Sequence, residues 1–167
     1  EVRIRSAAFL PDLSQIENIA EPVVNLEIIS PSGYLGSIMD LVSNFRNTYI
    51  STGYLGKDTV ILKYKVPLAE IVIDFYDKLK SVSSGYASMS YELAGTEVAD
   101  LVRLDIFIAE EMVEPFSRII PRGKAHYDGR EMVVMLKKIV PPQWFQVAIQ
   151  AAIGGKIIAR ETIGARR

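Results

Sequence analysis

Residues 141–167 read PPQWFQVAIQAAIGGKIIARETIGARR, and our interpretation of the chain starts from this stretch. Pro141-Pro142 ends the element before it, because proline has no N–H to donate and disfavours helical backbone in the residue that precedes it. Residues 144–152 are mostly apolar, which predicts a strand buried on at least one face. Gly154-Gly155 indicates a turn, since glycine adopts positive φ without strain. Residues 156–167 place isoleucines on one side and cations elsewhere, a pattern typical of an amphipathic helix.

A strand, a Gly-Gly turn and a cationic helix together favour binding of a polyanion over catalysis. Free N–H groups at the start of a helix attract phosphate, so Gly154-Gly155-Lys156 is a candidate phosphate site. A plain turn between a strand and a helix explains the same residues equally well. If phosphate binds there, we expect it to belong to an RNA backbone and not to a nucleotide.

Charge is distributed unevenly along the chain. Residues 1–114 hold nine Lys and Arg against 17 Asp and Glu, whereas residues 115–167 hold ten against three. This asymmetry favours RNA as a partner of the basic part, although scattered cations often form no more than a solvated surface. The candidate RNA-binding residues are Arg118, Arg122, Lys124, Arg130, Lys137, Lys138, Lys156, Arg160, Arg166 and Arg167.

Aromatic residues lie close to these cations in the sequence. Tyr127, Trp144 and Phe145 all fall in the basic part of the chain. The segment around Trp144 and Phe145 is strongly apolar, so we expect these two side chains in the core and not on a stacking surface.

Composition narrows the class of protein. The chain is 49% hydrophobic and 23% charged, which is typical of globular proteins. It has no cysteine and therefore no disulfide or thiolate metal site. No apolar run is long enough to span a bilayer, and no signal-peptide pattern opens the chain. Because it starts at Glu1 and stops directly after a predicted helix, we interpret it as a piece of a longer protein.

No motif for catalysis or metal binding stands out. Residues 53–58 fall short of a phosphate-binding loop, because Ser51 occupies the place of its first glycine and Asp58 would repel phosphate; we expect a hairpin turn. His126 is the single histidine, so we expect it to be a surface residue or an RNA contact and not a metal ligand. Asp74 and Asp77 are expected on a solvated helix face beside lysines. We therefore predict no catalytic residue, metal or cofactor in this chain.

Hydrophobic periodicity predicts an α+β fold with two units. Strands are expected at 23–29, 48–55, 59–66 and 86–93, and helices at 34–46 and 67–83. The resulting order βαββαβ, with right-handed crossovers, predicts a ferredoxin-like antiparallel sheet with two helices on one face.

The second unit is predicted to be a small α+β domain. We expect a strand at 101–109, a helix at 110–120, turns at 121–124 and 127–129, and a helix at 130–140 before the terminal stretch. The predicted organisation is a residual strand (1–9) and linker from an upstream domain at 1–20, the ferredoxin-like domain at 21–95 and the C-terminal domain at 96–167.

Several segments resemble one known family. They are PSGYLGSIMDL at 31–41, PLAEIVIDFYDKLKS at 67–81, GYASMSYE at 85–92, and IQAAIGGKIIARET at 149–162 preceded by Pro-x-Gln-x-Phe. All are similar to the C-terminal region of the LepA translation factors, also called elongation factor 4, which are ribosome-binding GTPases related to elongation factor G. The resemblance covers Leu10 to Arg167 and implies a ferredoxin-like domain V followed by the first part of a LepA-specific domain.

The resemblance also implies partners and a location. The parent protein would bind the ribosome, and its C-terminal domain would approach tRNA and large-subunit rRNA, with no DNA expected. GTP and Mg²⁺ would belong to an N-terminal domain outside this chain, so this part would be non-catalytic. The parent would be cytoplasmic in a bacterium or organellar in a eukaryote, and nothing in this sequence indicates membrane association.

Two positions depart from the family pattern. Asn47 stands where the family usually has glycine, and Pro142 replaces the usual arginine, which removes a cation from the predicted RNA-binding region. The alternative function is a protein–protein interaction module on the ferredoxin-like scaffold. A small enzyme with a carboxylate pair is a third option, and no motif supports it.

Overall fold

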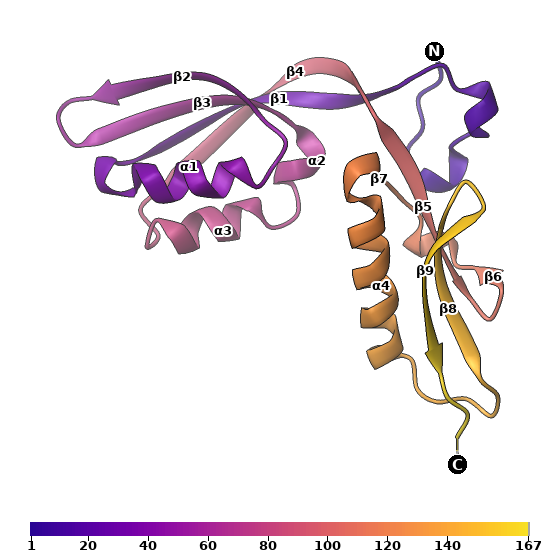
Figure 1. Ribbon diagram of the computed structural model, residues 1–167. Helices are drawn as coiled ribbons and strands as arrows, with labels where there is room; N and C mark the ends of the chain where they lie inside the picture. The colour runs from indigo at the N-terminus through magenta and orange to yellow at the C-terminus, as the bar shows by residue number, and fades with distance from the viewer. Residues whose placement is uncertain (167) are drawn as a thin grey trace. The chain divides into compact units, whose positions relative to one another are not determined.

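The computed structural model describes residues 1–166, which form two units with separate hydrophobic cores (Figure 1). One unit comprises Ala20–Val98, and the other comprises Glu1–Ile19 together with the chain from Ala99 onward.

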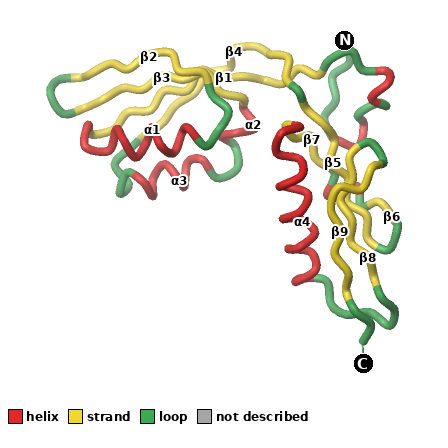
Figure 2. The backbone as a smooth tube through the Cα atoms, in the orientation of Figure 1, coloured by secondary structure: helices red, strands yellow, loops and turns green. Residues whose placement is uncertain are grey.

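The first unit has the predicted ferredoxin-like arrangement. Its elements are β1 (Ile19–Pro31), α1 (Leu35–Ser43), β2 (Thr48–Leu55), β3 (Thr59–Pro67), α2 (Leu68–Ile71), α3 (Phe75–Val82) and β4 (Ser88–Ala99). The strands form one sheet in the order β2-β3-β1-β4, and β3 is antiparallel to both β1 and β2. Figure 2 shows α1 and α3 on one face of this sheet.

Alternation along the central strands builds the core of the first unit. Leu26 and Ile28 of β1 face the helices opposite Tyr64 and Leu62 of β3, and all four are buried. The helices add a further set of buried side chains: Ile38, Val42, Phe75 and Leu79.

A polar cluster closes the end of α1. Arg46 donates hydrogen bonds to the carboxylates of Glu21 and Glu70. Burial alone would lower the pKa of Arg46, but these hydrogen bonds outweigh it and raise the pKa above its usual value. The Asn47 amide donates to the carbonyls of Val42 and Phe45 at 3.1 and 2.9 Å. The residue that departs from the family pattern therefore satisfies carbonyls at the helix end.

The predicted helix at 67–83 is divided in two. α2 ends at Ile71, residues 72–74 form a turn, and α3 begins at Phe75. Ile71, Val72 and Ile73 are all β-branched and lose side-chain freedom in a helix, which makes this the weakest point of the segment.

The expectation of a strand at 1–9 is wrong. Residues 7–9 form a single 3₁₀ turn, and Leu13–Gln15 form another. Val2 is 80% exposed, so the alternating apolar residues of this segment have no core to pack against. Instead of standing apart as a linker, residues 1–19 pack with the second unit, where the Arg103 guanidinium donates to the Leu10 carbonyl at 3.3 Å.

The second unit is an antiparallel sheet packed against one long helix. Its elements are β5 (Leu101–Ile108), β6 (Glu111–Met112), β7 (Arg118–Pro121), α4 (Ala125–Ile139), β8 (Val147–Ile153) and β9 (Lys156–Ile163). The sheet order is β6-β5-β8-β9, and β7 also pairs with β5. The core lies between α4 and the sheet, where Met132, Val133 and Leu136 pack with Leu104, Ile106 and Ile149.

The predicted helix at 110–120 is also wrong. Ala109 and Glu110 both adopt positive φ and reverse the chain, so that β6 folds back on β5. Arg118–Pro121 then pairs with the first half of β5. The edge of β5 provides the hydrogen-bond partners of β6 and β7, and local sequence cannot reveal this pairing.

Residues 127–129 are not a turn, because α4 begins at Ala125 and continues through them. Gly129 is buried at the contact with the sheet. A Cβ atom at this position would lie 2.9 Å from Ile158 Cδ1, 3.2 Å from Ala151 Cβ and 3.3 Å from Leu104 Cδ1. The glycine therefore permits a close helix–sheet approach instead of a change in chain direction.

The terminal segment is a strand where we expected a helix. Gly154 and Gly155 have φ of 56° and 79°, which suit a tight hairpin turn, and β9 pairs with β8 along its length. A register shift opposite Ala151 and Ala152 inserts one extra residue into β9. This bulge interrupts the period of two and gives the isoleucines a spacing that resembles a helix.

Candidate nucleic-acid interface

The hairpin removes the basis for a phosphate site at a helix N-terminus. Gly154-Gly155-Lys156 joins two strands, so no helix dipole points at this turn. Any affinity for phosphate here has to come from side-chain charge.

The candidate cations are spread over most of the second unit. Arg118 lies on β7, and Arg122 and Lys124 lie in the turn before α4. The remaining described members are Arg130, Lys137 and Lys138 on α4, Lys156 and Arg160 on β9, and Arg166 after β9. All nine are exposed, while Arg167 lies outside the described residues.

Some of these cations have partners within the protein. The Arg122 Nε atom lies 3.0 Å from Asp100 Oδ1, and the Lys137 ammonium lies 2.7 Å from Glu161 Oε2. Lys124 also interacts within the protein. These three are therefore less available to an RNA phosphate than exposed cations without such contacts.

The other described cations form no ion pair with a described carboxylate. They are Arg118, Arg130, Lys138, Lys156, Arg160 and Arg166. No acidic residue occurs between Glu131 and Glu161. The second half of α4 and the first half of β9 therefore carry positive charge without a neighbouring acid in the sequence, and the loop and β8 between them are uncharged.

Glu161 marks the end of this acid-free stretch. A hydrogen bond from Lys137, with a further electrostatic contribution from that residue and from Arg130, lowers the pKa of its carboxyl group. Glu161 therefore remains ionised near neutral pH and neutralises part of the charge at the junction of α4 and β9.

Trp144 and Phe145 contradict the expectation that they belong to the core. They are 80% and 81% exposed, in the loop between α4 and β8. β8 begins at Val147, three residues later than the apolar pattern predicted, because the strand pairs with β5 and β9 only from about that point. The adjoining Pro141-Pro142-Gln143, which has no apolar alternation, is the signal that could have placed these aromatics in a loop.

The residues without a predicted catalytic or metal-binding role lie at the surface of the protein or in a turn. His126 is exposed in the first turn of α4, and the described chain contains no cluster of His, Cys, Asp or Glu suited to a metal ion. Residues 53–58 lead into the β2–β3 hairpin turn, as predicted. Asp74 forms the predicted pair with Lys78 at 2.8 Å.

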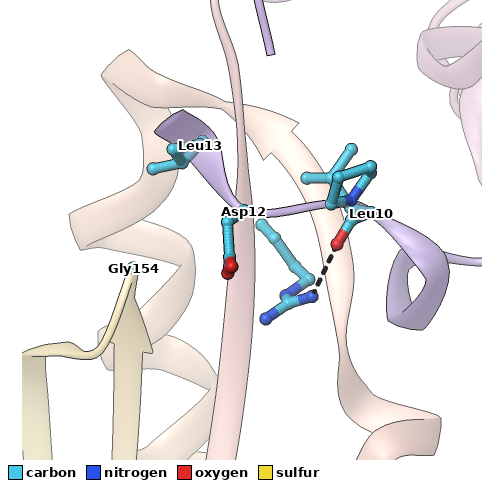
Figure 3. Close-up of a pocket in the computed structure, with 6 residues that line it drawn as sticks. Leu10, Asp12, Leu13 and Gly154 are labelled. Atoms are coloured by element: carbon cyan, nitrogen blue, oxygen red, sulfur yellow. Dashed lines mark hydrogen bonds between the residues drawn. The ribbon is translucent and has the colours of Figure 1, made fainter. Parts of the chain in front are cut away.

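One small pocket lies where the N-terminal segment meets the sheet of the second unit (Figure 3). It is lined by Leu10, Pro11, Asp12, Leu13, Arg103 and Gly154. The Arg103 guanidinium is already bound to the Leu10 carbonyl and to the buried Asp105 carboxylate, whose second oxygen accepts from Ser117. The charge in this pocket therefore stabilises the fold.

No helix in the part of the chain that the structure describes is long and apolar enough to cross a membrane.

Comparison with known proteins gives matches along nearly the whole chain. The family described as the elongation factor G C-terminus matches residues 18–107, and the family described as the C-terminus of GTP-binding protein LepA matches residues 108–167. Elongation factor 4 of Sulfurimonas denitrificans is 47% identical over 98% of this chain and 27% of its own length. For elongation factor 4 of Campylobacter jejuni the values are 49%, 97% and 27%.

Elongation factor 4 of Clostridium acetobutylicum is 46% identical over 99% of this chain and 28% of its own length. The chain thus spans little more than a quarter of these relatives. A crystal structure of a protein from Thermus thermophilus matches 49% of this chain and 12% of its own, with 18% identity and a TM-score of 0.45.

Proposed function

The chain belongs to the elongation factor 4 (LepA) family, and we propose that it is the ribosome-docking, RNA-binding C-terminal part of a translational GTPase. In this proposal the ferredoxin-like unit is a scaffold, and the second unit contacts tRNA and large-subunit rRNA. GTP and Mg²⁺ would bind elsewhere in the parent protein, and this part would be non-catalytic. The parent would act in the bacterial cytoplasm.

One observation carries the proposal. The second unit presents exposed cations that form no ion pair with the described carboxylates, and these include Lys138, Lys156, Arg160 and Arg166. They belong to a stretch of chain whose only acid after Glu131 is Glu161. Exposed cations of this kind neutralise phosphates and release counterions, which is the main source of affinity in sequence-independent RNA binding.

The arrangement also indicates the kind of contact. The arginine and lysine side chains lie exposed on a strand and a helix, from which long flexible cations reach phosphates. We therefore infer that recognition depends on the shape and position of the RNA, with little direct reading of sequence by these cations.

A protein-interaction module is the second candidate function. Its support is the set of large apolar side chains exposed on the first unit: Tyr54, Ile73, Tyr86 and Leu93, which are 64%, 80%, 68% and 73% exposed. Exposed apolar surface of this kind is often a protein-binding site when it is contiguous. An apolar interface responds little to salt, which separates it from RNA docking.

Charge reversal on the β8–β9 hairpin tests the proposal. We expect Lys156→Glu with Arg160→Glu to weaken binding to tRNA and to large ribosomal subunits without unfolding the protein, because both side chains are exposed. If both side chains contact phosphates, the slope of log K against log[salt] becomes shallower by roughly 0.7–0.9 for each phosphate that is no longer neutralised. Filter binding at several salt concentrations measures this slope.

The control is Lys57→Glu with Lys63→Glu, which makes the same charge change on the β2–β3 hairpin of the first unit, where Lys63 lies 3.4 Å from Glu27. We expect it to leave the slope unchanged. A folded Lys156/Arg160 variant with wild-type affinity and slope would remove these residues from the interface. Absence of RNA binding by the wild-type chain at low salt would favour the interaction module.

A further inference from the structure

The loop that joins α4 to β8 displays two large aromatic side chains. Residues 141–146 are all exposed, and Trp144 and Phe145 rank among the most exposed large apolar residues of the described chain. Burying such side chains is favourable, so two neighbours left exposed to water indicate a binding role.

Hydrogen bonds hold the base of this loop. The Gln143 side-chain amide donates to the Pro141 backbone carbonyl at 3.1 Å. The Gln143 backbone carbonyl accepts from the Arg166 backbone N–H at 2.9 Å. Figure 2 shows this loop beside the segment that follows β9. Two consecutive prolines restrict the chain further. The aromatic tip is therefore presented on a restrained loop, which lowers the entropy lost on binding.

Cations lie on both sides of the aromatic tip along the chain. The backbone of Arg166 is hydrogen-bonded to the loop, and Lys138 lies in the last turn of α4. Neither side chain pairs with a carboxylate of the described chain, and residues 132–160 contain no acid. An exposed aromatic pair flanked by free cations matches the two faces of a nucleotide, a flat apolar base and an anionic phosphate.

We propose that Trp144 and Phe145 form a stacking site for unpaired RNA bases, with Arg166 and Lys138 contacting the adjoining phosphates. The site rests on the RNA-binding function proposed above and adds to it a class of ligand, which is single-stranded or unstacked nucleotides. Base–aromatic stacking tolerates any base, because every base has a π-face.

A membrane surface is the competing ligand for exposed Trp and Phe beside cations. Membrane-surface helices bury a whole apolar face in the lipid interface. The apolar face of α4 is already packed against its own sheet through Met132, Val133 and Leu136. Besides Trp144 and Phe145, α4 exposes Met135 and Ile139 at 45% and 67%, which is less than a whole apolar face and favours a nucleotide over a bilayer.

Trp144 is the only tryptophan of the chain, so its fluorescence reports directly on this loop. We expect an oligouridylate or oligoadenylate of about a dozen residues, long enough to cover a typical single-strand site, to quench the fluorescence of the wild-type chain and to protect Trp144 from acrylamide. An abasic oligomer of equal charge should bind in a competition assay without quenching. Vesicles with anionic lipid serve as the membrane probe and should leave the spectrum unchanged.

Substitutions separate stacking from general hydrophobic contact. Trp144→Ala and Phe145→Ala should each weaken oligonucleotide binding roughly 5- to 150-fold, the range for loss of one stacked base, and should leave the salt slope unchanged. Trp144→Phe keeps an aromatic face and should retain most of the affinity, whereas Trp144→Leu should not. Tyr54→Ala removes a similarly exposed aromatic from the first unit and should have no effect.

The outcomes distinguish this inference from the function on which it rests. RNA binding measured by anisotropy, without quenching and without weakening in the Ala variants, would overturn the stacking site and leave RNA docking intact. Absence of any RNA binding would overturn both. A blue shift of Trp144 with vesicles but not with RNA would assign the loop to a membrane surface instead.

Discussion

Glu161 is the only acidic residue after Glu131, and it links α4 to β9. Its side chain accepts a hydrogen bond of 2.7 Å from Lys137. Because this bond lowers the pKa of Glu161, the ion pair contributes stability above the pKa of the unfolded chain. That contribution is lost as the pH falls through the lowered pKa of the folded state.

Glu161→Gln tests this contact and the electrostatic argument together. At pH 7 we expect the variant to unfold at a lower urea concentration than the wild type, and the difference should vanish at acid pH, where the wild-type carboxylate is protonated. The same variant should bind tRNA roughly two- to fivefold more tightly at low salt, since one acid is removed and Lys137 is freed.

Glu111→Gln is the control, because Glu111 is exposed and forms no ion pair with the described residues. It should change neither the urea midpoint nor its dependence on pH. A constant stability difference between wild type and Glu161→Gln from acid to neutral pH would show that the carboxylate charge does not stabilise this junction.

At the scale of elements, the approach of α4 to its sheet depends on a residue without a side chain. Gly129 faces Ala151 of β8, Leu104 of β5 and Ile158 of β9. All three lie within 3.3 Å of the Cβ that any other residue would bring. Glycine is about 1 kcal/mol less favourable than alanine within a helix, so packing against the sheet explains its presence here and helix formation does not.

Gly129→Val should destabilise the second unit by about 1–3 kcal/mol, because the larger side chain forces the helix away from a closely packed sheet. The matched control is Gly36→Val in α1, where an added Cβ would meet nothing within 4 Å. Valine is a better helix former than glycine, so we expect that variant to be neutral or slightly stabilised. Urea unfolding followed by circular dichroism compares the two, and equal effects would refute the packing argument.

The whole molecule consists of two units, and the first 19 residues belong with the C-terminal one although they precede the other in sequence. Arg103 of β5 reaches back to the Leu10 carbonyl, and Leu13 Cδ1 would lie 3.4 Å from a Cβ at Gly154. The N-terminal segment therefore packs on β5 and on the β8–β9 turn of its own unit.

Removal of residues 1–16 should lower the stability of the second unit only. Loss of the hydrogen bond from the Arg103 guanidinium costs about 1–3 kcal/mol, because the donor is charged. Hydrogen exchange followed by mass spectrometry resolves the two units, and we expect faster exchange in β5 and β8 with unchanged exchange in β1 and β3. Equal acceleration in both units, or none in either, would contradict this organisation.

The sequence by itself determined the ferredoxin-like unit, the family and the basic character of the last third of the chain. In β1 and β3 the alternation is regular, because each strand has one face covered by helices and one that is not, and loop residues mark its ends. Residues close together in the chain carry this information, so periodicity could detect it. Contact between the ten candidate cations and RNA remains a prediction.

Only the tertiary structure decided the second unit. β9 resembled a helix because its bulge is set by pairing with β8, and β7 resembled a helix because its partner β5 lies more than a dozen residues earlier. Trp144 and Phe145 were expected inside because they adjoin an apolar strand, yet the strand begins only at Val147, where its pairing with β9 starts. A residue's burial depends on what covers it, and those covering elements are distant in sequence.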